Sequence, residues 1–222
     1  MVLIDLLPLI VGAAVLPVWI IASLLLLRSE GGVIKAAAFA AGAMTVRVLQ
    51  GILFGFVFDA AASASGDGGP KLITSTLLLV VAILLLITAV RTWRREDDPD
   101  APPPRWMATL GGLSPLKAFG VGALLIGVSI KQWVFTLSAI AVVDEAQLGL
   151  KSSIVAYLVF VLAAQSLVLA PTIGSAVAPT RSARMLEVLQ GRLERHSRMI
   201  TTVVSSIFGV WFLWKGMTGL LG

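Results

Sequence analysis

The stretch PLKAFGVGALLIGVSIKQWVFTLSAIAVV, residues 115–143, decides the fold class of this chain. It is apolar and longer than the roughly 20 residues that a helix needs to cross a bilayer. Lys131 stands near its middle and is followed directly by Gln132. An ammonium group at the bilayer centre costs about 3 kcal/mol on insertion scales and is typical of functional positions. The stretch therefore predicts a membrane-spanning helix that carries a functional charge.

The composition of the whole chain is that of an integral membrane protein. Of its 222 residues, 58% are hydrophobic and 13% are charged, whereas soluble domains carry about 25% charged residues. The chain has no cysteine and one histidine, and no carboxylate falls deep in an apolar run. We therefore expect no metal site, no cofactor and no enzymatic activity. The net charge of +5 indicates loops that face anionic lipid rather than a nucleic-acid partner.

Six apolar runs predict six transmembrane helices in an all-α fold. They cover approximately residues 3–27, 34–58, 72–90, 115–143, 152–173 and 199–221. Pro17 lies inside the first run and should kink or break that helix. Residues 59–71 read as a flexible loop, residues 91–114 as a cytoplasmic linker rich in charge and proline, and residues 181–198 as a basic amphipathic helix on the membrane surface.

The basic residues predict the orientation of the six helices. Of the seventeen Lys and Arg residues, twelve fall on the side that holds the odd-numbered loops and three on the other side, while Arg47 and Lys131 lie within the membrane. Because basic residues accumulate in cytoplasmic loops, both termini should face outward. The expected location is the bacterial plasma membrane.

The two halves of the chain, residues 1–90 and 115–222, are predicted to form an inverted repeat of three helices each. When the two halves of the sequence are aligned, Pro17-Val18-Trp19 matches Lys131-Gln132-Trp133 at an offset of 114 residues. Lys35 matches Lys151 at an offset of 116. Three helices per half place the fourth helix antiparallel to the first. This is a common plan for transporters.

Two deep cations form the candidate site. Arg47 lies 12 residues after Lys35, about 18 Å at helical rise, and Lys131 lies 14 residues after Lys117, about 21 Å. They should therefore sit at similar depth, one in each half. Cations without protein counter-ions favour an anionic guest such as a phosphate, sulfate or carboxylate. The alternative is that both cations donate to carbonyl groups at broken helices and only lock the bundle.

The other candidate substrate-binding residues offer neutral hydrogen bonds, a helix break or an aromatic wall. They are Gln50, Ser129, Gln132, Gln165, Pro17, Trp19 and Trp133.

Two segments carry a resemblance to a known family. PPPRWMATLGGLSPLKAFGVGALLIGVSIKQW and LQGRLERHSRMITTVVSSIFGVWFLWKGMTGLL resemble the sulfolipid- and glycopeptidolipid-addressing proteins of actinobacteria, which belong to the lysine-exporter superfamily. The resemblance extends in outline over the whole chain. That family usually has Asn-Pro-Lys in its fourth span, where this chain has Ser129-Ile130-Lys131, so the resemblance does not by itself predict a helix break here.

The resemblance implies export or translocation of a cell-envelope lipid or a small solute. We expect an anionic envelope lipid or glycolipid, with its headgroup held by Arg47 and Lys131. Two alternatives stay open: an exporter of a small solute such as an amino acid, and a non-transporting scaffold for lipid-synthesis or lipid-export machinery. The small residues of the second and sixth spans also make a homodimer plausible.

Overall fold

The computed structural model describes residues 2–15, 17–65, 69–94 and 109–221, and these residues are almost entirely helical. The helices are α1 (Val2–Ala14), α2 (Pro17–Leu27), α3 (Gly32–Ser65), α4 (Gly69–Arg94), α6 (Pro115–Val128), α7 (Ile130–Glu145), α8 (Leu150–Ala164), α9 (Ser166–Val177) and α10 (Pro179–Leu221).

Three of the predicted spans are single helices and three are bent pairs. Stretches of α3, α4 and α10 are each long and apolar enough to cross a membrane. The pairs α1–α2, α6–α7 and α8–α9 also pass as spans when each pair is taken together, with bends of 60°, 74° and 66°. The described residues thus carry up to six apolar spans, as the sequence predicts.

The break between α6 and α7 occurs at Ser129 without any proline. The Ser129 backbone is extended, with φ −80° and ψ 102°, and its N–H donates to the Leu125 carbonyl. The Ser129 hydroxyl then accepts a hydrogen bond from the backbone N–H of Gln132 at 3.5 Å. One serine therefore ends one helix and caps the next, which is the role for which serine is favoured at helix N-termini.

Glycine lets two pairs of helices approach closely. A Cβ on Gly42 of α3 would overlap the carbonyl oxygen of Phe119, and a Cβ on Gly122 of α6 would overlap that of Phe39. Gly209 and Gly216 of α10 similarly face Leu86 and Leu79 of α4. Small residues of the second and sixth spans therefore lie at helix contacts within the chain.

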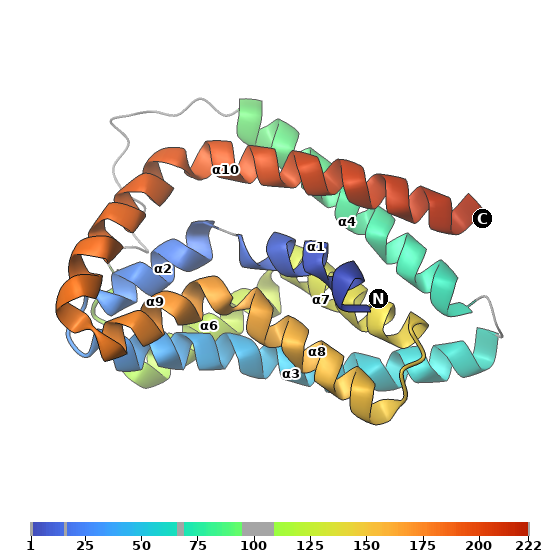
Figure 1. Ribbon diagram of the computed structural model, residues 1–222, viewed down its shortest axis with the longest axis horizontal. Coiled ribbons are helices and arrows are strands. Elements are labelled where there is room, and N and C mark those ends of the chain that lie inside the picture. The colour runs from blue at the N-terminus through green and yellow to red at the C-terminus, as the bar shows by residue number, and fades with distance from the viewer. Residues whose placement is uncertain (1, 16, 66–68, 95–108, 222) are drawn as a thin grey trace.

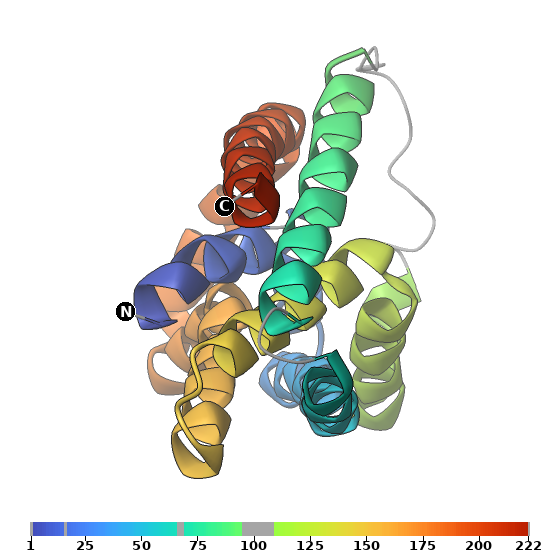
Figure 2. The same ribbon diagram turned by 90° about the vertical axis from the view of Figure 1, so that its right-hand side faces the viewer.

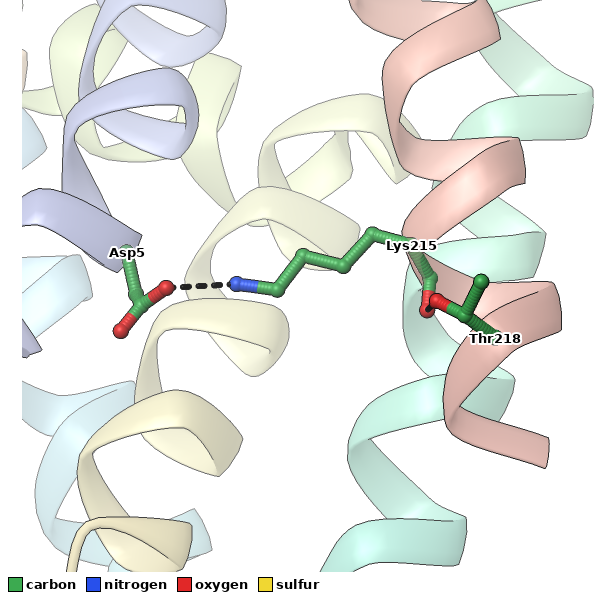
Figure 3. A network of polar contacts seen from close by, with 3 residues as sticks. All are labelled: Asp5, Lys215 and Thr218. Atoms are coloured by element: carbon green, nitrogen blue, oxygen red, sulfur yellow. Dashed lines mark hydrogen bonds and ion pairs between the residues drawn. The ribbon is translucent and has the colours of Figure 1, made fainter. Parts of the chain in front are cut away.

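The pair α4 and α10 runs side by side along one face of the bundle (Figures 1 and 2). Near the end of this pair, Lys215 of α10 contacts Asp5 of α1 across 2.7 Å (Figure 3). The beginning of the first helix and the end of the last helix therefore lie at the same end of the bundle. An even number of crossings requires this arrangement.

Two predicted boundaries differ from the structure. The predicted loop 59–71 is largely helical, because α3 continues to Ser65 and α4 begins at Gly69; the alanines that follow Asp59 favour helix. The predicted segment 181–198 is continuous with the last span in one curved helix, α10 (Figure 1). Of the predicted linker 91–114, residues 91–94 complete α4, and residues 95–108 lie outside the described residues.

Arg198 joins α10 to the end of α4. Its Nε donates to the Thr92 carbonyl at 3.1 Å and its Nη2 to the Trp93 carbonyl at 2.5 Å. These carbonyls belong to the last turn of α4, where no intrahelical donor remains and the helix dipole favours a cation.

Arg198→Gln should lower the free energy of unfolding by about 1–2 kcal/mol, because glutamine cannot supply both charged donors. Unfolding in detergent, followed by tryptophan fluorescence, measures the change. Arg195→Gln is the matched control, since Arg195 lies one turn earlier on α10 and is exposed. Equal stability losses in the two variants would contradict the capping role.

Candidate functional site

Arg47 is the centre of a buried polar network. It lies on α3 with none of its surface exposed. Its Nη1 donates to the Thr136 hydroxyl at 3.2 Å, and its Nη2 donates to Gln132 Oε1 at 2.5 Å. Both acceptors lie on α7 and are uncharged. Among the described residues no carboxylate pairs with Arg47, so the guanidinium charge is held by neutral oxygens alone.

Gln132 extends the hydrogen-bond network to α1. Its Nε2 donates to the Ala13 carbonyl of α1 at 3.4 Å. In a continuous helix the Ala13 carbonyl would accept from residue 17, but Pro17 has no N–H. Gln132 therefore satisfies the carbonyl that the proline leaves without its helical partner. This links the two sequence features, Pro17 and Gln132, through one hydrogen bond.

The other face of Arg47 contacts α8. The guanidinium carbon lies 5.7 Å from the centre of the Phe160 ring, in a cation–π arrangement. The Tyr157 hydroxyl donates to the Arg47 backbone carbonyl at 2.5 Å, and a Cβ on Gly51 would overlap the Tyr157 ring. Arg47 thus holds α3 against both α7 and α8.

Several buried polar atoms of these helices have no hydrogen-bond partner among the described residues. They are Arg47 Nε, both side-chain amide atoms of Gln50, Gln165 Nε2 and the Ser138 hydroxyl. Gln50 lies one turn beyond Arg47 on α3, and Gln165 sits at the bend between α8 and α9. A buried donor without a partner costs about 1–3 kcal/mol. The bundle therefore retains unused hydrogen-bonding capacity in its interior.

Lys131 follows the helix break, beside the network. It is half-buried and makes no hydrogen bond or ion pair with any described residue. Its sequence neighbours Ser129 and Gln132 form the cap and the network, so Lys131 stands at the junction of α6 and α7. The structure thus brings Arg47 and Gln132 into direct contact, and it joins Lys131 to them only through the chain.

The two candidate tryptophans do not contact Arg47. Trp19 is buried and packs on Phe39 with ring centres 5.4 Å apart. Trp133 donates from Nε1 to the Gly127 carbonyl at 2.6 Å and meets Phe54 edge-on at 5.5 Å. Trp133 therefore ties the start of α7 back to the last turn of α6 and supports the bend.

Three residues of the network were not among the sequence candidates: Thr136, Tyr157 and Phe160. Thr136 follows Gln132 by four residues and so lies on the same helix face, which is a signal that the sequence does contain. Tyr157 is the single tyrosine of the chain. Phe160 follows Tyr157 by three residues, but only the packing of α8 on α3 identifies either of them.

The outer surface of the bundle is strongly apolar. Leu116, Val177 and Phe56 are each at least 74% exposed, and many other large apolar side chains are also exposed. Such a surface suits contact with lipid rather than water. Together with the apolar spans and the buried arginine, it defines the class of the protein: a multi-pass α-helical membrane protein with a polar network at its helix breaks.

The chain belongs to the family described as Sap, sulfolipid-1-addressing protein, whose model matches residues 6–218. The match covers nearly the whole chain and confirms the resemblance that its sequence carries. Searches of curated proteins and of solved structures give no match.

Proposed function

We propose that this protein is a plasma-membrane transporter that translocates an anionic envelope lipid or glycolipid. In this proposal Arg47 and Lys131 hold the anionic headgroup between two three-helix repeats. Membership of the sulfolipid-1-addressing family supports a link to an anionic lipid. The observation that carries the proposal is a fully buried arginine whose side-chain hydrogen bonds, among the described residues, go only to neutral oxygens and whose Nε–H has no partner there.

Arg47 would exchange its neutral partners for the headgroup. A sulfate or phosphate adds a full negative charge and can accept two parallel N–H bonds from a guanidinium, which strengthens the interaction relative to a neutral acceptor. A sulfate or phosphate that reaches Arg47 therefore competes well against Gln132 Oε1 and the Thr136 hydroxyl. The hydrogen bonds of Arg47 to Gln132 and Thr136 then belong to the substrate-free state, in which these two side chains supply the oxygens that the oxyanion supplies on binding.

Lys131 and the amides would complete the headgroup site. Lys131 has no partner among the residues that the structure describes and lies at a helix break, which suits a residue that meets a ligand as it enters. Gln50 and Gln165 carry buried donors that find no partner within the described ranges. An anionic headgroup with several oxygens would accept hydrogen bonds from these donors. Binding would then remove the free-energy cost of burying them without a partner.

The helix breaks support the inverted-repeat part of the proposal. The first span is broken between α1 and α2, and the fourth span is broken at Ser129; these two spans are equivalent in the two proposed repeats. Discontinuous helices at equivalent positions typically line the substrate site of a transporter. The fifth span is also broken, whereas α3, its proposed counterpart, is continuous.

The double variant Arg47→Gln, Lys131→Gln tests the function. In liposomes, movement of a fluorescent phosphatidylglycerol from the inner to the outer leaflet can be followed by dithionite quenching. We expect the double variant to lose at least about 100-fold in rate, because two charged hydrogen-bond donors at about 1.5–3 kcal/mol each are removed. Lys117→Gln is the control, since Lys117 is exposed at the start of α6.

The same assay separates the competing functions. A double variant that stays folded and moves the lipid at the wild-type rate would reject the proposed site. Movement of glutamate or inorganic sulfate, with none of the lipid, would favour export of a small solute. No movement of any substrate by the wild type, together with co-purification of lipid-synthesis proteins, would favour a scaffold.

A further inference from the structure

A cavity of about 920 Å³ lies at the end of the bundle where the first and last helices meet. Its walls come from α1, the end of α7, the start of α8 and the last turns of α10. Its volume falls within the range of about 300–1,000 Å³ that is usual for ligand sites. Arg47, Gln132 and Lys131 do not line it, so the cavity is separate from the network described above.

Two of the four charged residues in the cavity wall neutralise each other. Lys215 Nζ lies 2.7 Å from Asp5 Oδ1, and both side chains are partly exposed, at 34% and 42% (Figure 3). Lys215 also lies over the Trp211 ring at 5.6 Å. This ion pair links α1 to α10 and forms a fixed polar part of the wall.

The other two charged residues in the cavity wall have no partner among the described residues. Glu145 ends α7 and Lys151 lies in the first turn of α8, and both line the same cavity. Neither makes an ion pair or a hydrogen bond with a described side chain. The turn between them is fixed by positive φ angles at Gln147 and Gly149. The cavity therefore presents one carboxylate and one ammonium group that are unpaired within the described part of the chain.

The remaining wall is apolar and accessible. Leu3 of α1 is 54% exposed and Val155 of α8 is 60% exposed, and both line the cavity. A small polar solute would leave this surface unused. An amphiphile would cover it with a hydrocarbon chain while its headgroup meets the charges.

We propose that this cavity binds a zwitterionic phospholipid with a primary ammonium group, of the phosphatidylethanolamine type. Glu145 accepts hydrogen bonds from the ammonium, Lys151 donates to the phosphate, and an acyl chain lies along Leu3 and Val155. The wall charges sum to zero, which matches a zwitterion and gives a net anionic lipid no advantage. This site goes beyond the proposed transport function and does not depend on it.

Lipid binding to the purified full-length protein tests the site. Native mass spectrometry of the protein in detergent, titrated with phosphatidylethanolamine or phosphatidylglycerol, gives the two affinities. Phosphatidylethanolamine should bind more tightly. Glu145→Gln and Lys151→Gln should each weaken its binding by about two- to five-fold, the range for exposed charge pairs. Leu3→Ser and Val155→Ser should weaken it as well.

Phosphatidylglycerol provides the decisive comparison. Glu145→Gln should strengthen its binding and Lys151→Gln should weaken it, whereas both variants weaken binding of the zwitterion. A general loss of structure would change both lipids in the same direction. Glu30→Gln and Lys117→Gln are the charge-matched controls, because both residues are exposed and neither lines the cavity.

Three results would overturn the inference. One is tighter binding of phosphatidylglycerol than of phosphatidylethanolamine by the wild type. The second is an equal effect of the control variants. The third is displacement of the lipid by an equal concentration of soluble phosphoethanolamine, which would show that the apolar wall contributes nothing. Transport by the Arg47 and Lys131 variants is a separate measurement, so failure here leaves the proposed function untouched.

Discussion

Gln132→Leu should lower the free energy of unfolding by about 3–5 kcal/mol, the cost of leaving a buried charge without compensation. Leucine would remove the acceptor that holds Arg47 Nη2 and the donor that satisfies the Ala13 carbonyl. Arg47 would keep a single side-chain hydrogen bond, to Thr136, at a position with no exposure. Unfolding by SDS in mixed micelles, followed by far-UV circular dichroism, measures the loss.

Gln50→Leu is the matched control for this prediction. Gln50 is 5% exposed and Gln132 is 1% exposed, so the two glutamines are similarly buried. Neither side-chain amide atom of Gln50 has a partner in the part of the chain that the structure describes, so leucine there removes unsatisfied groups and should leave stability unchanged or raised. A Gln50→Leu variant as unstable as Gln132→Leu would contradict the network and point to packing alone.

Gln132→Glu separates the two roles of Arg47. A carboxylate at this position accepts from the guanidinium, so the helices stay joined and the stability loss should be smaller than with leucine. The new ion pair neutralises the charge that we propose for the headgroup. A folded Gln132→Glu protein should therefore translocate anionic lipid poorly, and full activity would show that Arg47 serves only to lock the bundle.

Gly122→Ala should destabilise the protein by about 1–3 kcal/mol or more, the usual cost of overpacking. The new methyl group would overlap the Phe39 carbonyl oxygen of α3, a backbone atom that cannot rotate away. The two helices would have to separate, and Gly42 of α3, which faces α6 in the same way, would lose its contact. The same detergent unfolding measurement reports the change.

Gly120→Ala provides the comparison on the same helix. A Cβ at Gly120 meets nothing within 4 Å, so alanine there should raise stability by about 0.5–1 kcal/mol through helix propensity. The two alanine variants should thus differ in sign although they lie two residues apart. Destabilisation of similar size in both would mean that helix propensity or lipid contact, rather than the approach of α3 to α6, decides the result.

The fold class and much of the site follow from local chemistry. Six apolar runs predicted six spans because a bilayer leaves backbone groups no partner outside a helix. Arg47 and Gln132 were identified because polar groups in apolar runs need partners. Pro17 was expected to break the first helix because it has no N–H. The roles of Arg47 and Lys131 in substrate binding stay predictions.

Other features depend on which helix faces which. No proline marks the break at Ser129 in the sequence, and serine occurs in many unbroken helices. Tyr157 and Phe160 look like ordinary apolar-helix residues until α8 is placed against α3. Pairing of Asp5 with Lys215 joins residues 210 apart in sequence, and no periodicity within one helix predicts it.

The amino-acid sequence alone indicates a helical membrane protein of up to six spans and places two cations in apolar runs with no acid nearby, because the cost of burying charge and backbone is a local property. Three other features depend on tertiary packing: Arg47 is held by Gln132 and Thr136, Gln132 satisfies the carbonyl freed by Pro17, and Lys131 has no partner in the described part of the chain. Hydrogen bonds reach about 3 Å, so partners on different helices are chosen by how the helices pack, and that packing is a property of the whole chain.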